Sequence, residues 1–202
     1  MKIIRDFFCI RIQKALSAAF LAIFLPNAFA IPSQIDVIGI IPGVSTFKET
    51  IEKTYKRSND VYLIGGFAIE CIFRIRGSIF TGTDRIDKFY CPFGSSTDIS
   101  SPNRPIIVSA ENVFEKLAKG FTEKFGLVLP ELKKACSAGD YIVNCLAWVD
   151  SKGNILMLFL MKNPGEGQNF SGRLELKSRA LVIEEADKKV REALESEDNR
   201  RF

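Results

Sequence analysis

Few side chains of this chain could carry out acid–base or nucleophilic chemistry. The chain contains no histidine, the residue that most often serves as general acid, general base or zinc ligand near neutral pH. Ser45 and Lys48 have the S-x-x-K spacing, in which a lysine one helical turn after a serine can activate the hydroxyl for acyl transfer. No K-T-G or S-D-N segment accompanies them, and Ser45 and Thr46 are also suited to cap a helix. We expect capping here, with a Ser/Lys acyl-enzyme as an alternative.

Two pairs of carboxylates could cleave glycosides only if the acids faced each other across a cleft. Glu184 and Glu185 open a charged helical segment, and Asp84 and Asp87 lie in a Gly- and Thr-rich turn, which predicts solvated surface for both pairs. Gly65-Gly66 precedes neither a helix start nor a Lys-Ser/Thr pair, so it predicts a bulge rather than a phosphate site. We therefore expect no catalytic, cofactor-binding or metal-binding residues.

The N-terminal thirty residues have the three parts of a secretory signal peptide. A basic start precedes an apolar run at residues 15–25, and Ala28-Phe29-Ala30 has the small-x-small pattern that signal peptidase recognises. The run is shorter than the ~20 apolar residues that span a bilayer. No cysteine follows it where a lipid would be attached. We expect residues 1–30 to be a cleaved signal and the protein to be periplasmic or secreted.

Removal of the signal leaves a nearly neutral chain. The full chain has 28 basic and 24 acidic residues. The signal contains four of the basic residues and one of the acidic residues, so residues 31–202 keep 24 basic and 23 acidic residues. Such a chain, without a dense Lys/Arg cluster, has no electrostatic footprint for nucleic acid or for an anionic membrane. We expect neither partner, and no membrane span after signal cleavage.

Four cysteines follow the signal, an even number in an oxidising compartment, which predicts two disulfides. Three pairings are possible, and we favour Cys71–Cys91 with Cys136–Cys145 because each closes a short loop. The alternative of a four-thiolate metal site lacks any C-x-x-C spacing and has no histidine to complete a zinc shell.

The pattern of the remaining residues predicts an α+β fold, with an antiparallel β-sheet packed by two or three helices. Strands are expected at 36–41, 61–76, 89–91, 141–149, 155–161 and 173–180. Helices are expected after the Thr46/Glu49 capping box, from Ser109 to a stop at Gly126, and at 184–198. The helix after Ser109 has an apolar stripe of Phe114, Leu117, Phe121 and Phe125, and Trp148 should anchor the 141–161 hairpin.

Residues 31–202 are expected to form one compact domain. Its halves, at about 31–95 and 104–183, have a similar order of helix and strands, followed by the terminal helix 184–198. This similarity has two interpretations: a tandem αβ repeat, or the general likeness of any two αβ segments.

Gly39-Ile40-Ile41-Pro42-Gly43-Val44-Ser45, with the helix after it, resembles a turn of small bacterial envelope proteins. The outer-membrane assembly lipoproteins of the SmpA/OmlA type and the β-lactamase-inhibitor-like proteins share this pattern. The segment from Phe114 to Gly126 is similar to the second helix of tandem members. The acid that follows the serine comes one place later here, at Glu49, and the lipid-bearing cysteine is absent. The resemblance implies a binding or assembly module without catalysis.

The expected function is therefore an exported, non-enzymatic module that binds a protein or envelope component. Candidate contact residues are Phe93, in an expected surface loop at 92–105, and the charged stripe Arg173, Lys177 and Arg179. The simpler interpretation of the stripe is a solvated sheet face. A second hypothesis is an inhibitor of an extracytoplasmic hydrolase, in which the 92–105 loop would enter the enzyme's cleft.

Overall fold

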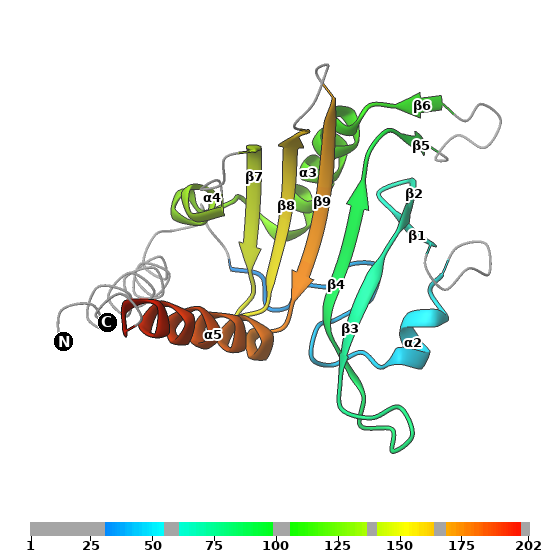
Figure 1. Cartoon of the computed structure of the whole chain (residues 1–202). Helices are drawn as coiled ribbons and strands as arrows, with labels where there is room; N and C mark the ends of the chain where they lie inside the picture. Colours follow the sequence, from blue (N-terminus) through cyan, green and yellow to red (C-terminus); the bar gives the residue numbers. More distant parts are fainter. Residues whose placement is uncertain (1–30, 55–60, 99–105, 137–140, 164–168, 199–202) are drawn as a thin grey trace.

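Two antiparallel β-sheets form the framework of the protein (Figure 1). The structure, a computed structural model, describes residues 31–54, 61–98, 106–136, 141–163 and 169–198, so the predicted signal lies outside the described residues. The strands are β1 (Val61–Ile64), β2 (Phe67–Glu70), β3 (Ile72–Arg76), β4 (Arg85–Phe93), β5 (Ser96–Asp98), β6 (Ile106–Val108), β7 (Ile142–Val149), β8 (Ile155–Lys162) and β9 (Phe170–Lys177). The helices are α2 (Phe47–Ile51), α3 (Ala110–Phe125), α4 (Pro130–Cys136) and α5 (Arg179–Asp198).

The larger sheet has the strand order β3-β4-β9-β8-β7, and the smaller one β1-β2-β5-β6. All pairings in both sheets are antiparallel, and the helices pack around them, which confirms the α+β class. The larger sheet takes β3 and β4 from the first half of the chain and β7 to β9 from the second. The two halves therefore share one sheet. The described residues contain four helices, and the short α4 was not predicted.

Helix α3 covers one face of the larger sheet and supplies much of the core. Ser109 caps it by accepting a hydrogen bond from the Asn112 N–H at 3.4 Å, and Gly126 ends it. The predicted apolar stripe is buried: Phe114, Leu117, Phe121 and Phe125. Trp148 is 2% exposed and donates its indole N–H to the Gly126 carbonyl at 3.0 Å. The predicted helix and the Trp148 anchor are both confirmed.

The expected strand at 36–41 is a tight turn instead. The Val37 and Ile40 backbones bond to each other in both directions, at 3.1 and 2.9 Å. The turn places Ile38 at φ 53° and Gly39 at φ 75°, and the Asp36 carboxylate accepts the Gly39 N–H at 3.2 Å. The prediction was wrong because the apolar residues here are buried by the turn's packing, not by pairing in a sheet.

Gly65 and Gly66 form the two-residue turn between β1 and β2, not the bulge that we expected. Both have positive φ, 58° and 88°, the backbone geometry that favours glycine in tight hairpins. A Cβ on Gly65 would lie 2.7 Å from a Leu117 methyl carbon, so the turn also packs closely on α3.

The described part of the expected surface loop at 92–105 contains the end of β4 and the short strand β5. β4 continues to Phe93 because it pairs with β9, placing Phe93 opposite Gly172. Phe93 is only 6% exposed, and a Cβ on Gly172 would lie 1.9 Å from its ring. Residues 99–105 lie outside the described residues. Phe93 is therefore a core residue, and this burial argues against the partner contact predicted for it.

The last strand ends at Lys177, and α5 begins at Arg179, five residues before the predicted start. The Ser178 hydroxyl accepts the Leu181 N–H at 3.2 Å and begins the helix. The sequence pattern extends the strand to residue 180 because charged and apolar types alternate over most of residues 173–180. The strand stops at Lys177 because Ser178 caps the helix that begins directly after it.

The structure has two disulfides, Cys71–Cys91 and Cys136–Cys145, which is the favoured pairing. The first joins the corner between β2 and β3 to β4, and its two residues are 3% and 0% exposed. The second joins the end of α4 to β7. Among the described helices, none combines the length and the apolar character needed to cross a bilayer.

The two bridges should differ in their reactivity. Cys136 is half-buried, whereas the Cys71–Cys91 bridge is enclosed in the core. Because thiol–disulfide exchange needs access of a thiolate to sulfur, we expect a mild thiol reductant to open Cys136–Cys145 first in the folded protein. Alkylation followed by peptide mass mapping measures the order. Equal labelling of all four cysteines, or earlier labelling of Cys71 and Cys91, would contradict this expectation.

Candidate interaction site

The predicted charged stripe is not a solvated face. Arg173 and Lys177 lie on β9 on either side of Glu175, which is only 5% exposed. The Glu175 carboxylate lies 3.1 Å from Arg173 Nε, 3.1 Å from Lys177 Nζ and 3.7 Å from Lys88 Nζ. The cations therefore neutralise a buried acid.

Lys177 and Arg173 have further partners within the protein. Lys177 Nζ lies 2.8 Å from a Glu185 oxygen, and the Arg173 guanidinium lies 4.3 Å above the Phe159 ring. Burial alone would lower the pKa of Lys177, but the bonds to Glu185 and Glu175 outweigh it and the pKa is raised. Arg179 is exposed and lies on α5, whereas Arg173 and Lys177 lie on β9. The structure does not bring the three residues together as one contact surface.

The Ser45 hydroxyl is engaged in a hydrogen bond to the backbone. Ser45 is 4% exposed, and its Oγ accepts the Ile41 N–H at 3.0 Å. Thr46 and Glu49 form the predicted capping box, and the resulting bond to the Thr46 backbone lowers the pKa of Glu49. Lys48 is exposed on α2. This arrangement supports the capping interpretation of the S-x-x-K segment.

Asp84 and Asp87 are buried, at 4% and 1% exposed, so the prediction of solvated surface for them was wrong. Asp84 accepts the backbone N–H of Phe47. Asp87 accepts the Ser178 hydroxyl at 2.8 Å and pairs with the Arg76 guanidinium. These bonds connect the β3–β4 hairpin to the start of α2, through Asp84, and to the residue before α5, through Asp87. Glu184 and Glu185 remain partly exposed, at 43% and 41%.

The hairpin tip, residues 77–83, is the most exposed apolar feature of the described residues. Ile79 is 50% exposed and Phe80 is 101% exposed. The tip carries no charged side chain. Figure 1 shows it projecting beyond the rest of the molecule, at the end of β3 and β4. Ile79 and Phe80 are adjacent and form an exposed apolar patch, the kind of surface feature that marks interaction sites.

Internal hydrogen bonds define the conformation of the tip. The Thr83 N–H donates to the Ser78 carbonyl at 3.1 Å, and the Gly82 N–H to the Ile79 carbonyl at 3.3 Å. The hydroxyls of Thr81 and Thr83 bond to each other at 2.8 Å. Gly77 has φ 87°, and a Cβ there would lie 2.5 Å from the Thr83 carbonyl oxygen. The turn therefore depends on this glycine.

The base of the hairpin is tied to α5. Glu184 accepts hydrogen bonds from Arg74 and Arg76, both at 2.7 Å. The bond from Arg74 and the two positive charges lower the pKa of Glu184, and the bond to Asp87 raises the pKa of Arg76. The tip is thus presented on a hairpin whose base is bonded to its surroundings.

The Glu184 ion pairs should stabilise the protein only where Glu184 is ionised. Its folded-state pKa lies below the usual 4.5, so this stabilisation is present above the unfolded-state pKa and is lost as the pH falls through the folded-state pKa. We expect Glu184→Gln to lower the urea midpoint at neutral pH and to match the unsubstituted protein in strong acid. Glu192→Gln, which removes a 3.6 Å pair with Lys188 on the same helix, is the control. A deficit of Glu184→Gln that persists in strong acid would contradict the assignment.

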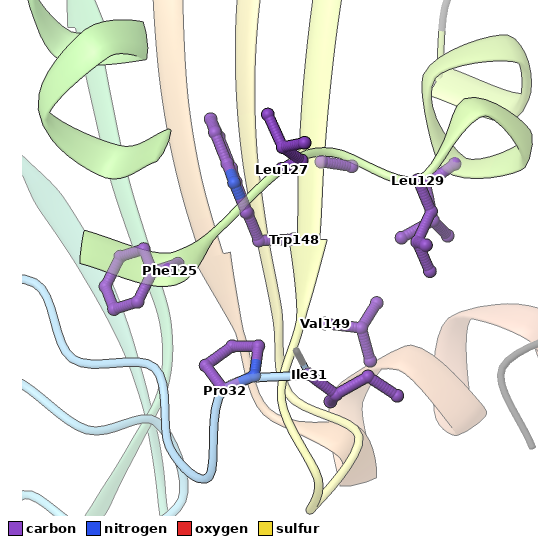
Figure 2. A pocket seen from close by; sticks show the side chains of 9 residues that line it. Ile31, Pro32, Phe125, Leu127, Leu129, Trp148 and Val149 are labelled. Atoms are coloured by element: carbon purple, nitrogen blue, oxygen red, sulfur yellow. The ribbon is translucent and has the colours of Figure 1, made fainter. Parts of the chain in front are cut away.

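A small apolar hollow lies between the first described residues, the C-terminal end of α3 and strand β7. Figure 2 shows Ile31 and Pro32 near Phe125, Leu127 and side chains of β7 around it. Its volume is about 20 Å³, room for about one water molecule. The hollow is too small for an organic ligand. Within the described ranges, no group of three or more His, Cys, Asp or Glu residues is arranged to hold a metal ion.

No family model, no curated protein and no solved structure matched the chain when it was compared with them.

Sequence reasoning missed the tip because it considered residues 77–83 only as a turn. One signal was available: an Ile-Phe pair stands between glycines in a segment that joins two strands. Apolar residues at the centre of a hairpin turn have no sheet neighbour to cover them.

Proposed function

We propose that this protein is an exported, non-catalytic binding module whose β3–β4 tip inserts into an apolar pocket of a partner protein. The observation that carries the proposal is Phe80, 101% exposed on a turn with defined hydrogen bonds. Export rests on the signal pattern at residues 1–30, and the two disulfides are compatible with an oxidising compartment.

The tip has the properties of an interface anchor. Burying a phenylalanine side chain gains about 1.5–3 kcal/mol, and a few aromatic anchors usually supply most of the binding energy. The bonds within residues 77–83 reduce the conformational freedom that binding would otherwise remove. A rigid aromatic tip therefore suits a preformed pocket.

The charges near the tip favour a protein pocket over an anionic membrane. Arg74 and Arg76 are paired with Glu184 and Asp87, and Arg85 donates to the carbonyls of Gly82 and Asp84. Membrane attachment through a small apolar loop generally needs additional unpaired basic residues. The nearly neutral sequence after residue 30 also lacks a basic cluster.

The second candidate function is an inhibitor of an extracytoplasmic hydrolase. A projecting hairpin with one fully exposed aromatic residue favours it, because such a tip can enter an enzyme's cleft. The candidate inhibitory loop then becomes residues 77–83 instead of 92–105. An inhibitor would block its partner's active site at one-to-one stoichiometry, whereas an assembly module would leave the partner's activity unchanged.

The proposal is tested by photo-crosslinking from the tip. A benzophenone side chain at position 80 should yield one dominant protein adduct in the cells that produce the protein. The same group at Ile107, which is 78% exposed on β6, is the control. A matching adduct pattern from both positions, or no adduct from position 80, would count against the proposal.

A further inference from the structure

The second half of α5 is exposed to solvent, and no other described segment covers it. Every residue from Asp187 to Ser196 is exposed, although α5 as a whole continues to Asp198. Figure 1 shows the helix running past the lower ends of β9, β8 and β7. An isolated helical segment as short as 187–196 is marginally stable in water, and most helices are stabilised by packing of an apolar face.

An apolar stripe follows the exposed side of this helix. Ile183, Val190 and Leu194 are 49%, 43% and 54% exposed. The spacing of i, i+7 and i+11 places them on one face of the helix. Leu181, by contrast, is fully buried at the start of α5, so a different face of the helix contacts the body.

The residues beside the stripe are complementary to a second copy of the same helix. If two α5 helices lie antiparallel with Asp187 opposite Arg191 of the second copy, the twofold symmetry creates the same pair a second time. This register also places Ile183 within one residue of Leu194 of the second copy, and the two Val190 side chains within two residues of each other along the helix axes. The charge contact and the apolar contacts therefore agree to within two residues.

We propose that α5 pairs antiparallel with α5 of a second copy of this protein. The contact spans about 18 Å of helix, and specific interfaces usually bury more than ~1,000 Å². The dimer should therefore be weak and depend on concentration. This inference does not rest on the proposed function of the hairpin tip.

Sedimentation velocity of the purified protein over a range of concentrations tests the pairing. We expect a monomer at low concentration and a dimer at concentrations on the order of 100 μM. Leu194→Asp should weaken the dimer about tenfold or more, because it places a charge in the apolar contact. Asp187→Arg should weaken it because two arginines would then face each other across the contact, and Asp187→Arg combined with Arg191→Asp should restore it.

Lys188→Glu is the matched control, because Lys188 lies on the opposite face and pairs with Glu192 at 3.6 Å. It should leave the dimer unchanged. Circular dichroism of each variant verifies that α5 is still helical. A protein that stays monomeric at all concentrations would overturn the proposal, and so would a dimer that resists Leu194→Asp or is not restored by the double charge reversal.

Discussion

Replacing Phe80 by serine is expected to reduce capture of the partner at least about thirtyfold, equivalent to about 2 kcal/mol. The ring makes no contribution to the core because it is fully exposed. The free energy of unfolding should therefore change by less than about 0.5 kcal/mol. Binding is measured as the yield of the position-specific adduct, with the benzophenone moved to Ile79 in the serine variant and in its parent.

Two further variants separate the role of the ring from the role of the turn. Gly77→Ala should also reduce capture, because its Cβ meets the Thr83 carbonyl oxygen and the turn must rearrange. Gly94→Ala, where a Cβ would meet nothing within 4 Å, is its control. Full capture by Phe80→Ser, or an equal loss from Ile107→Ser on β6, would show that the tip is not the contact.

Asp150→Ala is expected to cost about 4 kcal/mol of folding free energy, the largest effect on stability that we predict. Asp150 is 3% exposed in the turn between β7 and β8. Its carboxylate accepts four N–H groups at 2.9 to 3.0 Å: the backbones of Ile35, Lys152 and Asn154, and the Asn154 side chain. Alanine would leave these donors without their acceptor in a buried place.

Urea unfolding followed by fluorescence of Trp148, the single tryptophan, measures the loss. Asp36→Ala is the matched control, because Asp36 is also a turn acid but is partly exposed and pairs with Lys124 at 2.7 Å. It should cost about 1 kcal/mol or less. If Asp150→Ala cost no more than Asp36→Ala, the four hydrogen bonds would not be the main support of this turn.

The long helix and the central hairpin could be predicted because their signals are local. Ser109, the apolar stripe of α3 and Gly126 all lie within one segment, and capping and periodicity act within a few residues. The strands β7 and β8 join through a five-residue turn that needs no distant partner. The short loops between cysteines likewise indicated which sulfurs would pair.

The candidate site could not be predicted in the same way. Phe93 and Phe80 are the same residue type, and each has a glycine within three positions along the chain, yet one is 6% exposed and the other 101%. The difference arises because Phe93 packs on Gly172 of a strand far along the chain, whereas no segment of the described chain covers Phe80. Exposure of an apolar residue depends on neighbours that local sequence does not specify.

The sequence by itself determined the class of fold, the favoured disulfide pairing and the ends of α3, because propensity, spacing and capping act over short distances. Only the tertiary structure decided which charges are buried. Asp87 is held by Ser178, 91 positions away, and Glu175 by Lys88 of the neighbouring strand. A carboxylate is stable in the interior only if donors reach it from other segments, and those donors come together only when the chain has folded.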